Sequence, residues 1–338
     1  MKIKLGQIGI GHNHGTAKML AARKFPELFE IVGYAEESEE WVAKRGNLPA
    51  YEGLPRLSVE EVLARSDAIL VETEVQKLTK TAQLCVDAGK HIHMDKPASG
   101  TLEEFKHLLD TAREKNLVVQ MGYMYRYNPA VQKCLALIDE GKLGQISFIN
   151  AEMSAYDPPE YKKWLSQFPG AGMYIFGSHL LDLVIRILGE PEKITSFAKH
   201  TGLDGVDLPD LTCAILEYPK ALARITNSSV EVNGYGRRQF VVCGSKGTVN
   251  IVPIERPTRM MYSDLEMGAR WHNDVQTQLE VEDLPASDRY REMMECFHGY
   301  ITGEKQNIYT YEHDFLVQKV LSQIVGGIRL HSKNIDER

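Results

Sequence analysis

The sequence lacks the features that would direct it to a membrane, to nucleic acid or to a disulfide-stabilised fold. No apolar stretch is long enough to span a bilayer. No run of lysine and arginine occurs, and a formal net charge of −7 disfavours binding to DNA or RNA. The five cysteines are scattered, odd in number and without a Cys-x-x-Cys pair, which is typical of reduced thiols rather than of a disulfide framework or a zinc site. We therefore expect a cytoplasmic protein with no membrane or nucleic-acid partner.

Length and composition indicate a globular protein with two domains. The chain has 338 residues, more than one ordinary hydrophobic core accommodates. Hydrophobic residues make up 43% and charged residues 25%, as is average for globular proteins, so each half can bury a core. Residues 1–10 read as a strand that leads into a glycine motif, and for that reason we expect no signal peptide there.

Residues 1–122 alternate short apolar runs with helical patterns. The run 68–71 is continuously apolar, which is typical of a parallel strand buried on both faces. Two helices are expected to begin at capping boxes, at 58–61 and 101–104. The expected strands are 3–10, 30–35, 68–71, 91–94 and 117–121, and the expected helices are 16–24, 37–45, 58–65, 78–88 and 101–116. The alternation predicts an α/β Rossmann domain with a doubly wound parallel sheet over residues 1–122.

Beyond residue 122 the pattern changes to longer strands with hairpin-like connections. A segment rich in Pro, Gly and Tyr, 155–171, is expected to be a loop over a site. The expected strands are 145–154, 193–200, 211–218, 221–229, 239–243 and 248–252, and the expected helices are 129–140, 172–188, 287–302 and 312–329. We interpret residues 123–338 as one α+β domain for substrate binding and oligomerisation, built on a large and mostly antiparallel sheet.

A glycine motif lies between the first strand and the first helix. Gly9 permits a tight turn, and Gly11 lets the backbone approach a pyrophosphate at the N-terminus of the helix. The third glycine position holds His14, with Gly15 beside it. At the end of the second strand, Glu36 is placed to accept hydrogen bonds from ribose hydroxyls and to repel a 2′-phosphate, which favours NAD over NADP. The alternative is a plain glycine turn and a surface glutamate.

With its segment Asp95-Lys96-Pro97, the chain resembles the glucose–fructose oxidoreductase/inositol dehydrogenase/MocA (Gfo/Idh/MocA) family, in which this motif reads Glu-Lys-Pro. The resemblance covers about residues 3–200. It also includes the segments 88–91, 122–129, 141–146 and 177–182, the last with the pattern Gly-x-His-x-x-Asp. The order and spacing of these segments together are specific. The resemblance implies an NAD(P)-dependent dehydrogenase that acts on a CH–OH group.

The resemblance implies two catalytic residues. The lysine matching Lys96 lies beside the nicotinamide and the substrate hydroxyl, and the histidine matching His179 lies across the substrate. A lysine held before a proline is rigid, and partial burial lowers its pKa toward the working range. His179 and Asp182 are three residues apart on a helix and share one face. The alternatives are a solvated Lys96, a buried structural His179, and an Asp182 that is as readily a structural partner as a substrate ligand.

The sequence departs from the family where the general base is expected. Ile175 occupies the position of an aspartate four residues before the histidine, and the segment 73–78 lacks the family's Pro, Asn and His. We therefore expect proton transfer to fall on Lys96, with His179 or Tyr174 as a secondary donor. The substrate class and net redox turnover stay open.

Candidate ligand-binding residues fall into two groups. Those for the cofactor are Gly9, Ile10, Gly11, His12, Asn13, His14, Glu36, Thr73, Asp95 and Lys96. Those for the substrate are Tyr123, Arg126, Tyr156, Trp164, Tyr174, His179 and Asp182. Polar donors and flat aromatic rings suit a hydroxylated ring compound, whereas the alternative for the stretch 123–129 is hinge packing.

Several histidines raise the question of a metal. His12, His14, His93 and Asp95 could lie near one edge of the sheet, where such ligands are able to bind a transition metal. We expect no metal and favour the alternative, in which His12 and His14 line the cofactor and His93 packs beneath the site.

We predict an NAD-dependent oxidoreductase that transfers a hydride between nicotinamide and a secondary alcohol or ketone of a sugar, polyol or related compound. One alternative is an NAD-retaining sugar hydrolase or lyase that uses transient oxidation. Another is a non-catalytic regulator that binds NAD or a sugar. In the resembling family the outer face of the antiparallel sheet packs subunit to subunit, so we also expect a homodimer or homotetramer.

Overall fold

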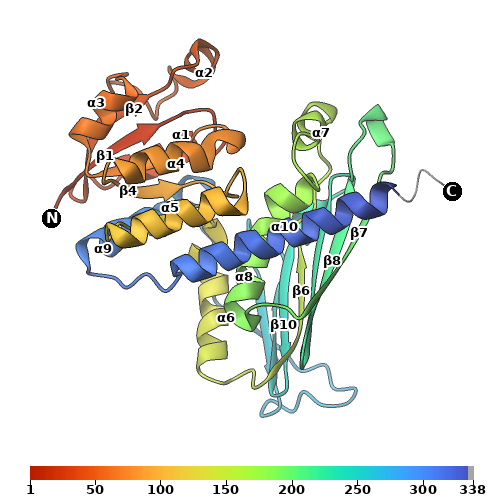
Figure 1. Ribbon diagram of the computed structural model, residues 1–338. Helices are drawn as coiled ribbons and strands as arrows, with labels where there is room; N and C mark the ends of the chain where they lie inside the picture. The colour runs from red at the N-terminus through yellow and green to blue at the C-terminus, as the bar shows by residue number, and fades with distance from the viewer. Residues whose placement is uncertain (334–338) are drawn as a thin grey trace. The chain divides into compact units, whose positions relative to one another are not determined.

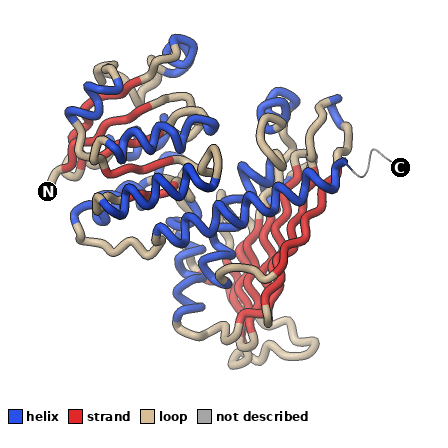
Figure 2. The backbone as a smooth tube through the Cα atoms, viewed as in Figure 1, coloured by secondary structure: helices blue, strands red, loops and turns tan. Residues whose placement is uncertain are grey.

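The computed structural model describes residues 1–333, which divide into two compact units (Figures 1 and 2). The first unit comprises Met1–Met124 and Ala286–Gln318, and the second comprises Tyr125–Pro285 and the described residues from Lys319 to Lys333. This differs from the predicted division at residue 122, because a late segment returns to the first unit. The reason is tertiary packing, which the sequence pattern does not predict. Helix α9 (Arg291–Thr302) in that segment contacts α1 (Gly15–Arg23).

The first unit is built on a five-stranded sheet. All of its strands are parallel, in the order β2-β1-β3-β4-β5. Its strands are β1 (Ile3–Ile8), β2 (Phe29–Ala35), β3 (Ala68–Val71), β4 (His91–Met94) and β5 (Val119–Met121), and its further helices are α2 (Glu39–Arg45), α3 (Val59–Arg65), α4 (Leu78–Asp87) and α5 (Leu102–Glu114). The predicted Rossmann-type parallel sheet is confirmed.

Local sequence signals explain why these elements form where they do. Every residue of β3 is buried, as expected of a central parallel strand. Both predicted capping boxes are present, with reciprocal hydrogen bonds between Ser58 and Glu61 and between Thr101 and Glu104.

The second unit contains an eight-stranded sheet in the order β13-β12-β11-β10-β6-β9-β8-β7. One pair, β6 with β9, is parallel, and the other neighbouring pairs are antiparallel. The strands are β6 (Ile146–Glu152), β7 (Lys193–Lys199), β8 (Leu211–Tyr218), β9 (Ala221–Ser228), β10 (Gln239–Gly244), β11 (Gly247–Ile251), β12 (Met260–Asp264) and β13 (Thr277–Leu279). The predicted, mostly antiparallel sheet is confirmed, and two short strands, β12 and the edge strand β13, are additional to the prediction.

Helices cover one face of this sheet. Helix α8 (Ser178–Leu188) contacts β6 and β9, and the Ser196 hydroxyl of β7 donates to the Ile324 carbonyl of α10 (Tyr311–Lys333) at 2.9 Å. Figure 1 shows α8 and α10 along this face, with α6 (Pro129–Asp139) near its lower end.

The segment 155–171 corrects the sequence-based expectation of a loop. It contains α7 (Pro159–Leu165), which begins with proline at the first helical position. The helix expected at 172–188 begins with a π-helical turn over Met173–Gly177 and continues as α8. Within the described part of the chain, no helix combines the length and hydropathy needed to cross a bilayer.

Candidate active site

The glycine loop lies at the carboxyl ends of β1, β2 and β3. Gly9 has a φ of 86°, and a Cβ there would lie 2.5 Å from the backbone nitrogen of Thr73. A Cβ on Gly11 would lie 3.0 Å from Cγ of Glu74. Gly9 therefore needs glycine for the turn, and a side chain at Gly11 would crowd Glu74 beside the loop.

The third glycine of the loop is Gly15 rather than residue 14. Gly15 is the first residue of α1, and a Cβ there would lie 2.9 Å from Cβ of Glu72. It is thus the residue that lets the helix approach the end of β3 closely. The loop is one residue longer than the sequence interpretation assumed, and His14 is the additional residue.

The side chain of Glu36 is fixed where β2 ends. Its carboxylate accepts hydrogen bonds from the backbone nitrogens of Ile10, at 2.9 Å, and Ser38, at 2.8 Å. On the other side of the loop, the Arg45 guanidinium donates to the Ile10 carbonyl at 2.8 Å and to the Asn13 side chain at 2.9 Å. The loop is therefore held from both sides.

These residues fit a nicotinamide dinucleotide. The two glycines leave the backbone open to a pyrophosphate, and His14, which caps α1, makes no side-chain capping hydrogen bond, so the first turn keeps amide donors for an anion. Glu36 supplies the carboxylate for a ribose. The residues that would hold the dinucleotide are Gly9, Gly11, Asn13 and Glu36.

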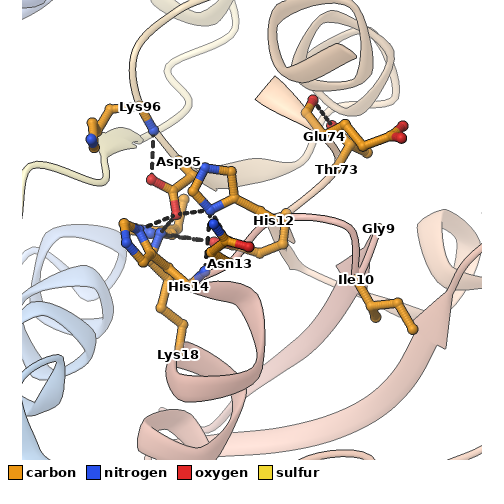
Figure 3. A network of polar contacts seen from close by, with 12 residues as sticks. Gly9, Ile10, His12, Asn13, His14, Lys18, Thr73, Glu74, Asp95 and Lys96 are labelled. Atoms are coloured by element: carbon orange, nitrogen blue, oxygen red, sulfur yellow. Dashed lines mark hydrogen bonds and ion pairs between the residues drawn. The ribbon is translucent and has the colours of Figure 1, made fainter. Parts of the chain in front are cut away.

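Asp95 is the centre of a buried polar cluster at the end of β4 (Figure 3). One carboxylate oxygen, Oδ2, lies 2.6 Å from Lys18 Nζ, 2.9 Å from His12 Nδ1 and 3.2 Å from His14 Nδ1. The other, Oδ1, accepts from the backbone nitrogen of Lys96 at 2.7 Å. Asp95 thereby links α1, the glycine loop and the turn that carries Lys96.

Lys18 is held as a buried ammonium. Its side chain is fully buried, and it donates to Glu72 Oε1 at 2.9 Å as well as to Asp95. Burial works to lower the pKa of Lys18, but the two carboxylates outweigh it and raise the pKa above its usual value. Burial raises the pKa of Glu72, whereas His12, Lys18 and His14 outweigh burial and hold the pKa of Asp95 well below its usual range.

Three histidines in this cluster are held neutral. Burial lowers the pKa of His12 and of His93, and it lowers the pKa of His14 to about 3. His93 lies beneath the site, with Nδ1 2.8 Å from Gln120 Oε1 and Nε2 3.7 Å from the Glu72 carboxylate. The His14 side chain is 26% exposed, against 7% for His12, so His14 is the most open of the three.

Ligand-capable atoms of His12, His14 and Asp95 lie within 4.8 Å of one another. The Lys18 ammonium, however, lies 2.6 Å from the carboxylate oxygen that both histidines share. A divalent cation at that oxygen would meet an adjacent positive charge, which disfavours metal binding.

Tyr290 is a member of this cluster that sequence reasoning missed. Its ring centroid lies 5.9 Å from Lys18 Nζ and 5.9 Å from the His14 ring centroid, and burial raises the pKa of its hydroxyl to about 12. Glu72 and Lys18 were missed as well. Lys18 is a charged residue on the buried face of α1, and that pattern was the available signal for it.

The second unit contains a separate polar group around His179. This histidine is buried in α8, and its ring centroid lies 5.5 Å from that of Tyr125. The Tyr125 hydroxyl donates to Glu255 at 3.1 Å, and Glu255 lies 3.4 Å from Arg238. Glu255 is a further carboxylate that sequence reasoning did not find.

Arg126 and Asp182, both predicted to bind substrate, are brought together. Arg126 donates to the Asp182 carboxylate from Nε at 2.9 Å and from Nη2 at 2.6 Å, and both side chains are buried. Such a bidentate pair satisfies both charges in the way a structural ion pair does. The arrangement favours the structural alternative for Asp182.

The other predicted substrate residues differ in exposure. Tyr123 is buried in the first unit, next to β5. Tyr156 is 55% exposed, whereas Tyr174 is buried, with its ring stacked on that of Phe168. The ring of Trp164, in α7, also packs on Phe168, with the two ring centroids 4.9 Å apart. A substrate role for each stays a prediction.

Known protein families match both units. Residues 3–123 match the family described as "Oxidoreductase family, NAD-binding Rossmann fold", and residues 131–250 match the "GFO/IDH/MocA C-terminal domain". The chain belongs to the Gfo/Idh/MocA family. It therefore carries a nicotinamide-binding Rossmann domain of the oxidoreductase type.

Individual relatives within the Gfo/Idh/MocA family are distant. An uncharacterized oxidoreductase of Schizosaccharomyces pombe is 24% identical over 73% of this chain and 70% of that protein. The scyllo-inositol 2-dehydrogenase (NADP(+)) IolW of Bacillus subtilis is 29% identical over 43% of this chain and 41% of IolW. The structure of the UDP-N-acetylglucosamine 3-dehydrogenase GnnA from Acidithiobacillus ferrooxidans has a TM-score of 0.79 at 18% identity, over 97% of this chain and 98% of that one, and so shares the fold.

The departures of this Gfo/Idh/MocA chain lie in both units. Ile175 is buried within the π-helical turn that precedes α8. Thr73 is partly buried, and its hydroxyl donates to the Glu74 carbonyl at 3.3 Å. Asp95 stands where the family motif has glutamate, and the lysine that follows it, Lys96, is 3% exposed.

Proposed function

We propose that this chain is an NAD-dependent oxidoreductase that transfers a hydride between nicotinamide and a secondary alcohol or ketone of a sugar, polyol or related compound. The observation that carries the proposal is the position of Lys96, buried and anchored to Asp95 through its backbone nitrogen at 2.7 Å. Membership of the oxidoreductase family supports it. Relatives named for inositol and for a nucleotide sugar support the substrate class.

Oxidation of the alcohol requires one proton-accepting group in the protein. A bound nicotinamide accepts the hydride, and the hydroxyl proton must go to a base as the carbonyl forms. We assign this role to Lys96, whose side chain is buried in the turn that follows β4. Asp95 fixes the backbone at Lys96, which limits the positions its side chain can adopt.

We propose NAD rather than NADP as the cofactor. The carboxylate of Glu36 is fixed by the Ile10 and Ser38 amides at the end of β2, where it would face a 2′-phosphate with like charge. Its position therefore favours a ribose with free hydroxyls.

The decisive experiment follows the absorbance of reduced nicotinamide in dialysed protein with added NAD. The alcohols tested are scyllo-inositol, levoglucosan, D-glucose and UDP-N-acetylglucosamine. A net increase with at least one of them is expected. Product formation without added NAD and without net reduction would instead show an NAD-retaining hydrolase or lyase. Binding of NAD without any product would show a regulator.

We also propose a homo-oligomer that forms through the outer face of the eight-stranded sheet. Phe148 and Leu222 are paired across β6 and β9, and with Phe197 of β7 they are 38%, 46% and 53% exposed. Exposed apolar side chains on an open sheet face are typical of an interface.

Light scattering at micromolar concentration tests this proposal. The wild type is expected to be a dimer or tetramer, and Phe148→Glu with Leu222→Glu is expected to reduce its mass to that of a monomer. Leu84→Glu, at an exposed apolar position of α4, is the matched control and should leave the mass unchanged. A monomeric wild type would contradict the proposal.

A further inference from the structure

The oxygen atoms of the glycine loop share one donor, the Arg45 guanidinium at the end of α2. Its Nη1 donates to the Ile10 carbonyl at 2.8 Å and also to the His12 carbonyl. Its Nη2 donates to the Asn13 side chain at 2.9 Å. Because the donor is charged, these hydrogen bonds are stronger than those between neutral groups. One side chain outside the glycine motif therefore fixes the conformation of the loop.

The two carbonyl contacts also set the direction of two amides. A trans peptide unit is planar, and its C=O and N–H groups point in opposite directions. The Ile10 carbonyl belongs to the same trans unit as the Gly11 amide. The His12 carbonyl belongs to the same trans unit as the Asn13 amide. Because both carbonyls point to Arg45, both N–H groups point away from it.

These two amides differ from the others of the loop in their hydrogen bonding. The backbone nitrogens of Gly9, Ile10 and His12 each donate to an oxygen outside the loop. Those of Gly11 and Asn13 make no hydrogen bond with any residue that the structure describes. Gly11 is buried, and buried backbone N–H groups without a partner are rare in native proteins. The pair of amides therefore indicates a ligand that accepts hydrogen bonds.

The charge of Arg45 is directed at the loop and not at an acidic side chain. In the described part of the chain, Arg45 makes its hydrogen bonds to loop oxygens and forms no ion pair. Burial lowers the pKa of Arg45, while Tyr51 and Glu36 counteract this effect. A guanidinium nevertheless stays charged in a protein. A positive charge behind two unpartnered amides suits an anionic ligand.

Trp41, four residues earlier on α2, limits the positions that the guanidinium can adopt. The guanidinium carbon of Arg45 lies 4.6 Å from the centroid of the indole ring. The indole nitrogen donates to the Glu74 carboxylate at 3.1 Å, so the ring is itself fixed. The arrangement of Arg45 and the loop is thus in place before a ligand binds, which lowers the entropic cost of binding.

We propose that Arg45 is a positioning residue for the diphosphate of the cofactor. By holding the carbonyls of Ile10 and His12, it presents two amides to the diphosphate oxygens. These are the amides of Gly11 and Asn13, so Arg45 acts through them and not by direct contact. A cation at the carbonyl end of a peptide unit also polarises its N–H group, which strengthens the hydrogen bond to an anion. The inference rests on the nicotinamide dinucleotide of the proposed function.

The first test uses NMR of the full-length protein. The sequence contains two Ile-Gly pairs, Ile8-Gly9 and Ile10-Gly11. Protein labelled in the carbonyl carbon of isoleucine and the nitrogen of glycine therefore gives two signals in a spectrum that correlates each carbonyl carbon with the following amide. Ile8→Val removes the signal of the first pair and so identifies both.

Without cofactor, Arg45→Met should shift the Ile10 carbonyl carbon upfield, because this carbonyl loses its charged donor. The Ile8–Gly9 signal should stay in place, since the Gly9 amide donates to a carbonyl of β2, and it reports that the loop remains folded. In the wild type, saturating NAD should move the Gly11 amide proton downfield as it gains an acceptor. An unchanged Ile10 carbonyl in Arg45→Met, or an unmoved Gly11 amide with NAD, would overturn the proposal.

The second test measures the Kd for NAD by calorimetry. Arg45→Met should raise it about tenfold or more, the scale of one hydrogen bond to a charged group. Arg45→Lys keeps the charge but not the fork of donors and should recover only part of the affinity. Lys44→Met is the matched control, since it also removes a cation of α2 beside the Trp41 ring, at 5.1 Å, but one that pairs with Glu40.

The Lys44→Met protein should bind NAD as the wild type does. An equal loss in Lys44→Met, or full recovery in Arg45→Lys, would show that positive charge alone matters and would refute the positioning role.

Both tests work without an alcohol, so the two proposals can fail separately. If Arg45→Met binds NAD as tightly as the wild type, the role of Arg45 is refuted and the proposed function stands. If the wild type binds NAD with the expected NMR shifts but oxidises no alcohol, the proposed function fails and the role of Arg45 in diphosphate binding stands. If the wild type does not bind NAD, both fail.

Discussion

Two buried ionic centres of this protein use their carboxylates differently. In the second unit, Asp182 is paired with Arg126 in a bidentate arrangement. In the first unit, Asp95 is shared by Lys18, two histidines and a backbone nitrogen. In the first arrangement two hydrogen bonds join one guanidinium to one carboxylate, whereas the second distributes the negative charge of one carboxylate over several donors.

The difference indicates which centre can respond to protons. A guanidinium does not lose its proton in a protein, so the cation of the Arg126–Asp182 pair is permanent. The Asp95 cluster contains neutral histidines that can take up a proton if a neighbouring cation is lost. The Arg126–Asp182 pair therefore has the character of a structural element, and the Asp95 cluster has that of a reactive one.

The largest expected effect comes from removing the cation of each centre. Arg126→Met should lower the free energy of unfolding by about 3–5 kcal/mol, because it leaves Asp182 buried with its charge uncompensated. The free energy of unfolding lost in Lys18→Met should be smaller at pH 6 than at pH 8. Lys18 lowers the pKa of His12, so its removal raises that pKa, and a histidine whose folded-state pKa is raised adds stability at low pH.

Urea unfolding of both variants at pH 6, 7 and 8 checks this contrast. A loss in Lys18→Met that does not change with pH would show that the Asp95 cluster is as inert as the Arg126–Asp182 pair.

The next largest effect concerns the reactive lysine. Lys96→Met should reduce turnover at least about a hundredfold, the usual scale for loss of a general base, while the fold is kept because the residue lies outside the strands and helices. In the wild type, activity should fall with decreasing pH through a single ionisation. Initial rates between pH 5 and 10 measure both effects.

Lys80→Met, at an exposed position of α4, is the control for Lys96→Met and should behave as the wild type. Activity of Lys96→Met close to that of the wild type would remove Lys96 from the mechanism. His179→Ala sharpens the comparison: if it is as inactive as Lys96→Met and the acid limb of its profile is lost, His179 is the base.

A smaller effect is expected in the pH dependence of stability. His14 is neutral in the folded protein down to a pKa of about 3, whereas an unfolded histidine takes up a proton below about 6.5. Its contribution to stability is therefore present above pH 6.5 and lost as the pH falls toward 3, at about 1.4 kcal/mol per pH unit. Between pH 5.5 and 4, His14→Gln should reduce the slope of the wild type by up to that amount. Identical slopes in guanidinium unfolding would show that His14 is not buried as a neutral ring.

The smallest effect is on the choice of cofactor. The wild type should bind NAD at least about tenfold more tightly than NADP, a difference of about 1.4 kcal/mol. Glu36→Ala should remove most of this preference, because it removes the like charge and leaves the neighbouring Arg56, which donates to the Glu36 carbonyl at 2.8 Å. Titration of both cofactors, followed by tryptophan fluorescence, measures the preference. Equal affinities in the wild type would be incompatible with the assigned role of Glu36.

Much of the fold could be predicted because its signals are local. The apolar run of β3, the capping boxes of α3 and α5 and the glycine after β1 each depend on a few neighbouring residues. Elements with weak local signals were missed, such as the short edge strand β13 (Thr277–Leu279) and α7, whose prolines read as a loop. The return of residues 286–318 to the first unit has no local signal at all.

The sequence by itself determined the alternation of strands and helices, the tight turn at Gly9 and the place of Lys96 after a buried strand, since each follows from neighbouring residues and chain sterics. Only the tertiary structure decided which glycine packs on β3 and which charges meet. His14 and Asp95 are 81 residues apart, and Arg126 and Asp182 are 56 apart. Contacts over such separations depend on how the elements pack, because burial removes water as a partner and each polar group must find another.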